Sequence, residues 1–268
     1  MGAYVDIHGH PTWVHRSADA AAGDATETVL VLHGGMSCSD DLLPSLEPPL
    51  SRAYHVAAFD RRGHGYTRDS DEPFHYAAMA EEVIGVIEHL GGPVHLVGWS
   101  DGGIAALLTS RERPDLVRRQ VLIGANFHHD GIVLTDDDLG AESPIGQAAA
   151  RAYSLRSPDG IEHFPVVEAK FQQMARTEPT LTVSDLETVT TPTLVLAGDD
   201  DMVRLDHTTA LYQALPAGQL AILPGASHAV PLEKPGLVGQ LILEFLTGPV
   251  PPQTALPVRR ATLGHPGR

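Results

Sequence analysis

The chain has 268 residues, of which 43% are hydrophobic and 19% are charged. These proportions are close to globular averages and exclude a disordered or fibrous class. The 34 acidic residues outnumber the 18 basic ones, which gives a formal charge of -16. Such a charge repels phosphate backbones and anionic lipid surfaces, so we expect no nucleic-acid partner.

The amino-terminal region lacks a basic stretch followed by an apolar run. The chain also lacks an apolar stretch of the roughly 18 residues that a membrane-spanning helix needs. Its lone cysteine, Cys38, cannot form an internal disulfide. We therefore expect a cytoplasmic protein with no membrane partner. The alanine-rich run at 18–25 is interrupted by Asp19 and Asp24, and we expect it to be a surface loop.

Short runs rich in β-branched residues alternate with helical patterns along the chain. An example of the helical patterns is 79–90, whose apolar residues recur on one helical face and which Gly91 would end. The alternation predicts an α/β protein with a mostly parallel, twisted sheet and crossover helices. The predicted strands cover residues 28–32, 55–59, 94–97, 120–123, 193–197 and 219–223.

Residues 126–189 break this alternation with an acidic run, with prolines that include Pro144, Pro158 and Pro165, and with otherwise helical patterns. We expect them to form a helical cap, or lid, inserted into a core that comprises residues 1–125 and 190–247. Aromatic residues of the cap could line a cavity, although packing between helices is the commoner role. These residues are Phe127, Tyr153, Phe164 and Phe171. Residues 248–268, rich in proline and arginine, are expected to be a tail.

A nucleophile elbow is predicted at the strand that ends near residue 97. The apolar run leads into Gly-Trp-Ser-Asp-Gly-Gly at 98–103, and a helical pattern follows at 104–108. The glycines two residues before and after the serine are needed because its strained backbone brings the flanking chains too close for side chains. Ser100, projecting over a helix N-terminus whose dipole favours negative charge, is the predicted nucleophile.

A glycine-rich loop, His33-Gly34-Gly35, follows the first predicted core strand. The backbone N–H of Gly35 is the candidate for one donor of an oxyanion hole. The second donor is expected to be the backbone N–H of Asp101, directly after the nucleophile. We expect His33 to brace this loop and to take no part in the chemistry.

A serine hydroxyl is too weak an acid to ionise at neutral pH, so it needs an imidazole base and a carboxylate that orients the base. Three aspartates, at 199–201, follow the strand at 193–197. His228 lies in a loop after the last predicted strand and is the predicted base. Ser, Asp and His occur in the chain order that this architecture uses, and the sequence alone leaves the choice of aspartate open.

Five segments of the chain resemble motifs of the α/β-hydrolase family, and the resemblance spans residues 1 to about 247. The string Gly-Trp-Ser-Asp-Gly-Gly in particular is similar to the valacyclovir hydrolase (biphenyl hydrolase-like) branch. The resemblance implies an α/β-hydrolase fold. It also implies that the acid lies three residues after the strand-terminal glycine, at Asp201, with Asp200 and then Asp130 as alternatives. The segments are 33–35, 60–65, 98–103, 198–201 and 225–228.

Two other features are expected to be structural. The segment at 60–65 should brace a loop, with Arg61 and Arg62 paired to nearby carboxylates. Several histidines could suggest a metal, but none has the ligand spacing of a zinc enzyme, and we expect no metal and no cofactor. They are His8, His10, His15, His128 and His129.

We therefore expect a serine hydrolase that cleaves a small carboxylic ester, a lactone or a thioester through an acyl-enzyme. In this family the same triad also serves carbon–carbon bond hydrolases and cofactor-free haloperoxidases. Serine at position 100 argues against dehalogenases and epoxide hydrolases, which use a carboxylate there. A non-catalytic binding protein of the same fold is the alternative from another class.

The partner we expect is a small-molecule acyl substrate. The resemblance to an amino-acid ester hydrolase implies that the Asp101 side chain lies at the mouth of the site and pairs with a substrate ammonium. Its structural alternative is a carboxylate that stabilises the first turn of a helix.

Overall fold

The computed structural model describes residues 2–17, 27–133, 138, 140 and 142–258. Within these ranges eight strands form one sheet in the order β1-β2-β4-β3-β5-β6-β7-β8, and neighbours from β4 to β8 run parallel. All six predicted strands are present, which confirms the predicted mostly parallel sheet. They are β3 (Thr28–Leu32), β4 (His55–Phe59), β5 (Val94–Trp99), β6 (Val117–Ile123), β7 (Thr193–Asp200) and β8 (Gly218–Ser227).

An amino-terminal hairpin was not predicted. Strands β1 (Gly2–Ile7) and β2 (His10–Arg16) pair antiparallel, and β2 also pairs antiparallel with β4. The two-residue turn has positive φ at both positions, 52° at His8 and 83° at Gly9, which suits the right-handed twist of a hairpin. The hairpin lacks the usual sequence signal, because asparagine, aspartate or glycine is the common first residue of such a turn.

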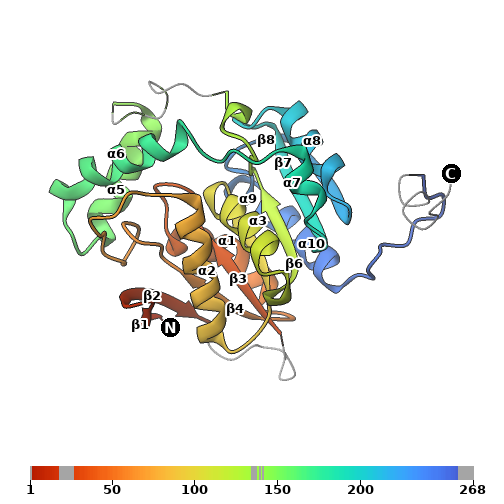
Figure 1. Ribbon diagram of the computed structural model, residues 1–268, viewed down its shortest axis with the longest axis horizontal. Coiled ribbons are helices and arrows are strands. Elements are labelled where there is room, and N and C mark those ends of the chain that lie inside the picture. Colours follow the sequence, from red (N-terminus) through yellow and green to blue (C-terminus); the bar gives the residue numbers. More distant parts are fainter. Residues whose placement is uncertain (1, 18–26, 134–137, 139, 141, 259–268) are drawn as a thin grey trace.

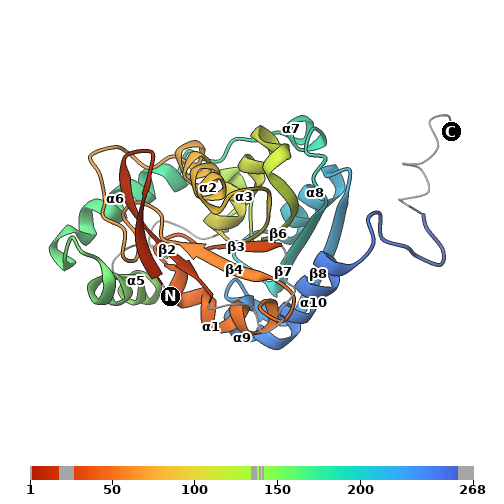
Figure 2. The ribbon, with the colours of Figure 1, turned by 90° about the horizontal axis from the view of Figure 1, so that it is seen from below.

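Helices cover both faces of the sheet, and Figure 2 shows α2, α3 and α8 on one face and α1, α9 and α10 on the other. Helix α2 begins three residues earlier than the predicted pattern and ends, as predicted, where Gly91 adopts a left-handed conformation. The helices of the two layers are α1 (Ser39–Leu50), α2 (Tyr76–Leu90), α3 (Asp101–Glu112), α8 (Leu205–Ala214), α9 (Val230–Glu233) and α10 (Pro235–Thr247). Short 3-10 turns, η1 to η3, span Pro114–Leu116, His129–Gly131 and Ile161–His163.

The central strands are largely apolar because both of their faces are buried. In β3, Leu30 and Leu32 join the hydrophobic cluster beneath α2 and α3. Val29 and Val31 point the other way, into the cluster beneath α1 and α10. The sheet thus separates two cores, and all the parallel strands end at one edge, where the candidate catalytic residues follow them.

Between β6 and β7 the described residues include the helices α5 (Pro144–Arg156), α6 (Phe164–Ala175) and α7 (Val183–Glu187). Figure 1 shows α5 and α6 together at one end of the molecule, whereas α7 lies beside α8. An ion pair of 2.6 Å between Asp185 of α7 and Arg111 of α3 holds α7 against the layered core. The expected cap at 126–189 therefore divides, and the name cap is used below for α5 and α6.

The cap is attached to the core by a buried carboxylate. Asp69 lies in the loop between β4 and α2, and its side chain is only 3% exposed. Its Oδ2 atom accepts hydrogen bonds of 2.8 Å from His163 and from Lys170, which lie at the start and on the body of α6. Lifting the cap would break both of these charge-assisted hydrogen bonds.

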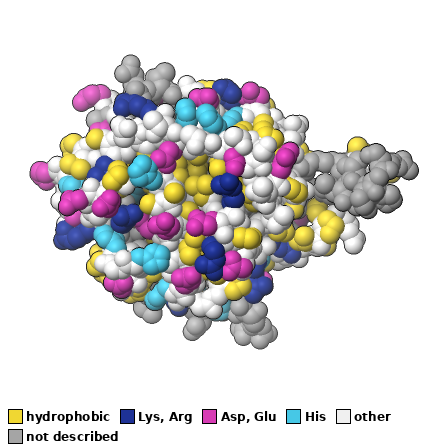
Figure 3. Space-filling view, in the orientation of Figure 1, with side chains coloured by type: hydrophobic (Ala, Val, Ile, Leu, Met, Phe, Trp, Pro, Cys, Tyr) yellow, Lys and Arg dark blue, Asp and Glu magenta, His cyan; other side chains and the backbone are white. Residues whose placement is uncertain are grey.

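The remaining expectations concern the surface. Residues 249–258 form no helix or strand and lead away from the body (Figure 1). The loop expected at 18–25 and the arginines at 259, 260 and 268 lie outside the described residues. Among the helices of the described ranges, none is both long and apolar enough to span a bilayer. Acidic, basic and histidine side chains are interspersed on the face drawn in Figure 3.

Candidate active site

Ser100 sits in the sharp turn between β5 and α3. Its backbone has φ of 53° and ψ of -121°, a conformation that L-residues rarely adopt and that costs about 1–3 kcal/mol. The surroundings hold it there: the Ser100 N–H donates to the Ile123 carbonyl at 2.8 Å, and the Ser100 carbonyl accepts from Gly103 N–H at 2.8 Å. The predicted elbow geometry is therefore present.

The glycines around Ser100 are required by close backbone contacts. A Cβ atom on Gly98 would lie 2.2 Å from the Gly102 carbonyl oxygen. A Cβ atom on Gly102 would lie 2.3 Å from the Leu32 carbonyl oxygen, in the neighbouring strand β3. These are the clashes that the sequence pattern predicted, and their absence allows β3, β5 and α3 to meet under the serine.

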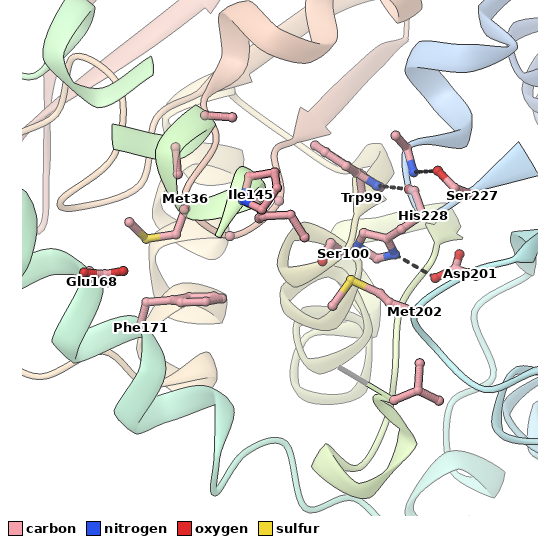
Figure 4. Close-up of a pocket in the computed structure, with 18 of the residues that line it drawn as sticks. Met36, Trp99, Ser100, Ile145, Glu168, Phe171, Asp201, Met202, Ser227 and His228 are labelled. Atoms are coloured by element: carbon pink, nitrogen blue, oxygen red, sulfur yellow. Dashed lines mark hydrogen bonds and ion pairs between the residues drawn. The ribbon is translucent and has the colours of Figure 1, made fainter. Parts of the chain in front are cut away.

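His228 is oriented by Asp201. The Nδ1 atom of His228 lies 2.7 Å from Oδ1 of Asp201, whose side chain is 2% exposed. The same Oδ1 accepts the Val203 N–H at 3.0 Å, which fixes the carboxylate. With Nδ1 donating, Nε2 of a neutral imidazole is free to accept a proton. Figure 4 shows the His228 ring between Asp201 and Ser100, so the structure brings the three predicted residues together.

The other candidate acids lie elsewhere. Asp199 accepts the Ala226 N–H at 3.1 Å and braces the neighbouring strand. Asp200 is exposed. Asp130 is 72% exposed and lies beside His128 and His129. Of the four aspartates weighed from the sequence, Asp201 is the one that contacts His228.

Gly124, which was not predicted as a site residue, leaves space for the His228–Asp201 pair. It follows β6 with φ of 56°. A Cβ atom there would lie 2.9 Å from His228 Nδ1 and 3.1 Å from Asp201 Oδ2. Glycine is thus needed both for the backbone conformation and for the space. The sequence feature that could have indicated this role is a glycine directly after a predicted core strand.

Two contacts outside the predicted site hold the His228 loop. The Trp99 indole N–H donates to the His228 carbonyl at 2.8 Å. The Glu233 carboxylate accepts from the Ser227 N–H at 2.8 Å and from the Ser227 hydroxyl at 2.7 Å. The residue before the nucleophile and the residue before the base are therefore both used to fix the position of the imidazole.

The glycine-rich loop after β3 lies against the nucleophile. A Cβ atom on Gly34 would be 3.3 Å from the Ser100 Cβ, and Gly34 and Gly35 both line the cavity that Ser100 faces. The next residue, Met36, has a strained φ of 53°. His33 does brace the loop as expected: its Nδ1 bonds the Gly34 carbonyl at 2.7 Å, and its Nε2 accepts the Arg61 N–H at 3.2 Å.

Arg61 departs from its predicted role. Arg62 pairs with Glu82 at 2.6 Å as expected, but no described carboxylate lies within ion-pair distance of Arg61. The buried Arg61 guanidinium instead donates to the carbonyls of His33 at 2.5 Å and Gly34 at 3.0 Å. Burial lowers the pKa of Arg61, and the nearby charge of Asp101 opposes that shift. Arg61 is therefore a cationic brace beneath the loop.

The predicted position of the Asp101 side chain is wrong. The side chain is 5% exposed and is not among the residues that line the cavity. Its Oδ1 accepts the Tyr76 hydroxyl at 2.8 Å. Its Oδ2 is directed at Gly35, where a Cβ atom would lie 2.7 Å away. Burial raises the pKa of Asp101, while the charge of Arg61 and the Tyr76 hydrogen bond oppose this. The carboxylate therefore lies between Tyr76 and the Gly35 backbone, out of the cavity.

The cavity beside Ser100 has a volume of about 720 Å³, in the range of small-molecule sites. Its floor comes from the sheet edge, and part of its wall comes from the cap. Phe164 and Phe171 of α6 line the cavity, whereas Phe127 and Tyr153 do not. Two of the four aromatic residues expected at 126–189 therefore line a cavity, which was the less common of the two predicted roles. Most of the remaining lining is apolar, and Figure 4 shows Met36, Ile145 and Met202 around the opening.

One group of described residues has ligand atoms close enough for a metal. His128, His129 and Asp130 each place one such atom within 4.8 Å of the others. His128 Nδ1 already accepts the Asp130 N–H at 3.2 Å, and none of the three lines the cavity. This group is therefore no part of the candidate site.

A family model described as the alpha/beta hydrolase family matches residues 29–241, which is most of the chain. The chain belongs to the alpha/beta hydrolase family. The order of strands, the elbow after β5 and the position of the acid and histidine after β7 and β8 agree with membership of this family. The predicted fold class is therefore confirmed, together with the expectation of an enzyme of this family.

Curated relatives and solved structures are similar over most of the chain. The serine hydrolase BPHL of Mus musculus is 26% identical over 248 residues, covering 84% of this chain and 80% of BPHL. The crystal structure of CarC, a serine hydrolase involved in carbazole degradation, has a TM-score of 0.75 at 21% identity and covers 92% of this chain and 98% of CarC. Carboxylesterase CesB from Bacillus subtilis has a TM-score of 0.71 at 23% identity, with coverage of 92% and 91%. The structural likenesses concern the fold.

Replacing Gly124 with alanine should lower kcat by at least about 10-fold, because displacement of catalytic groups by even 1 Å can cost about 100-fold. The matched control is Gly91→Ala: Gly91 also has a positive φ, 92°, but a Cβ atom there would meet nothing within 4 Å. Both variants should lose the stability that a positive φ costs a residue with a Cβ atom, and Gly124→Ala alone should also lose turnover. Equal activities of the two variants would contradict the role given to Gly124.

Unfolding free energy should fall as pH drops below about 6.5, the ordinary pKa of an unfolded histidine. Burial, aided by the charge of Arg61, lowers the pKa of His64 to about 3 and lowers that of His33 well below its ordinary value. The unfolded chain therefore binds more protons than the folded one in this range. Each histidine contributes a slope of up to about 1.4 kcal/mol per pH unit.

Urea unfolding at pH 7 and pH 5 measures this dependence. His64→Gln should reduce the slope, and the exposed His89→Gln should leave it unchanged. A slope that both variants share with the parent protein would show that other groups are responsible.

Proposed function

We propose that this protein is a serine hydrolase that cleaves small carboxylic esters through an acyl-enzyme. The observation that carries the proposal is the arrangement of Ser100, His228 and Asp201 at the floor of a cavity of small-molecule size. The strained serine and the buried His–Asp hydrogen bond are preorganised before any substrate arrives, which is where such sites gain most of their rate.

In the proposed reaction His228 Nε2 takes the hydroxyl proton of Ser100 while the serine oxygen attacks the substrate carbonyl carbon. Asp201 holds the Nδ1–H tautomer and stabilises the imidazolium that forms. The backbone N–H groups of Gly35 and Asp101 donate to the developing oxyanion. His228 then protonates the departing alcohol, and a water molecule activated by the same imidazole hydrolyses the acyl-enzyme and releases the acid.

The lining of the cavity supports a small, largely apolar substrate. Cap residues such as Ile145 and Phe171 cover one side of Ser100, and we assign the cap the role of a lid that excludes water and selects the acyl or alcohol group. Lactones and thioesters need the same nucleophile and the same oxyanion donors, so they fall within the proposed substrate class.

Ser100→Ala should lower ester hydrolysis by about 10⁴-fold or more while the fold is retained, because the elbow accepts a smaller side chain. A fluorophosphonate probe should label the parent protein at Ser100 and leave the variant unlabelled, which mass spectrometry of the peptide detects. A folded parent protein that the probe does not label would favour a non-catalytic binding role. Turnover above a tenth of the parent value in Ser100→Ala would reject Ser100 as nucleophile.

Asp201→Asn should reduce kcat by about 10⁴-fold, because an amide cannot hold the imidazole in the required tautomer. Asp200→Asn is the matched control, since it removes the same charge from the neighbouring, exposed position. Steady-state kinetics on one ester should show a small effect for the control. Equal, small effects in both variants would place the acid elsewhere.

A further inference from the structure

We propose that Glu168 forms a subsite for a cationic group carried by the substrate at the end remote from the scissile ester. This inference rests on the proposed function, because it assigns a substrate class to the same cavity. Glu168 lies on α6 and lines the cavity. Figure 4 shows it beside Met36 and Phe171, on the side of the cavity away from His228 and Asp201.

Helix α6 presents a regular stripe to the cavity. Phe164, Glu168 and Phe171 are spaced by four and then three residues, so they lie on one face of the helix, and all three line the cavity. A carboxylate between two aromatic rings is a suitable environment for an ammonium group, which gains an ion pair and contact with the π faces. The same stripe with an apolar residue at 168 would instead complete a hydrophobic wall.

Glu168 has no internal partner. Its carboxylate is half-buried, and among the described residues nothing forms a hydrogen bond or an ion pair with it. Lys170, two residues away, is already bound to Asp69 at 2.8 Å on the side of the core. The carboxylate therefore faces the cavity without a protein partner, and a cationic group bound there would supply the charge that the protein does not.

The charges that line the cavity also favour a cationic ligand. Three carboxylates line it, those of Glu168, Asp200 and Asp201, and the described lining includes no lysine or arginine. Asp201 is committed to His228, and Asp200 is exposed at the rim. An anionic substrate would meet repulsion with no cation to offset it. Glu168 is thus the lining carboxylate that is left to bind a positive group at the cap wall of the cavity.

This subsite differs from the one expected at Asp101. An ammonium on the carbon next to the ester carbonyl would lie beside Ser100, whereas Glu168 lies across the cavity from it (Figure 4). The structure therefore favours a cation separated from the ester by several bonds. The chemical class is an ω-ammonium ester, with the amine on either the acyl chain or the alcohol.

The test compares kcat/KM for pairs of esters that differ only in a terminal ammonium or a terminal methyl group. One pair carries the ammonium on a six-carbon acyl chain and the other carries it on a six-carbon alcohol. The parent protein should prefer the ammonium member of at least one pair by about 10-fold, as expected for a partly desolvated charge-assisted bond. Glu168→Gln should reduce this preference to about 2-fold or less.

Glu162→Gln is the matched control. Glu162 is an exposed glutamate of η3, between the two cap helices, and does not line the cavity, so this variant removes the same net charge without touching the proposed subsite. It should keep the full preference. Loss of the preference in both variants would mean that long-range charge is responsible, and retention in Glu168→Gln with loss in Asp101→Asn would assign the cation to Asp101. Either result overturns the proposal, as does a parent protein without any preference.

A binding measurement separates this proposal from the proposed function. In the Ser100→Ala background, calorimetry with hexylammonium ion and with hexanol should show about 10-fold tighter binding of the cation, and Glu168→Gln should remove the difference. Cation-selective binding without ester turnover in the parent protein would reject the hydrolase and keep the subsite. Equal binding of the two compounds would reject the subsite.

Discussion

The candidate site depends on the close approach of three backbone segments at the end of β5. Strand β3 and helix α3 touch through Gly102, and β5 and α3 touch through Gly98, at distances that leave no room for a Cβ atom. This contact forces Ser100 into its strained conformation and at the same time places the loop after β3 beside it. The nucleophile and the proposed oxyanion donors therefore share one rigid junction, which is the arrangement that electrostatic preorganisation needs.

Two buried charged side chains, Arg61 and Asp101, pack against this junction on the side that faces away from the cavity. The Arg61 guanidinium binds two carbonyl groups of the loop, and the carboxylate of Asp101 lies close behind Gly35. With those two carbonyls turned toward Arg61, the loop can present N–H groups to the cavity. The Arg61 charge also offsets that of Asp101, which would otherwise oppose an oxyanion nearby. These hydrogen bonds compensate for the burial of a guanidinium that is only 2% exposed.

The features that could be predicted from the sequence are those that local patterns determine. Six strands follow from apolar runs, and the residues that meet at the sheet edge follow from strand order and from the glycines of the elbow. The features that were missed depend on distances across the fold. No local pattern shows that Gly124 faces the His–Asp pair, that Arg61 turns to carbonyls, or that Asp101 points inward. Glu168 could have been noticed from its helical spacing to Phe164 and Phe171. That spacing indicates a binding role only when α6 is known to line the cavity that Ser100 faces.

The charge of the cavity also bears on what happens after the bond is broken. Ester hydrolysis converts a neutral acyl group into a carboxylate, so the proposed reaction would create an anion among lining residues that already include three carboxylates and, in the described part of the chain, no lysine or arginine. Like charges repel strongly where water is scarce. An acid product without an ammonium group would therefore be repelled from the cavity, so product inhibition by simple carboxylic acids should be weak and turnover should not wait on their release.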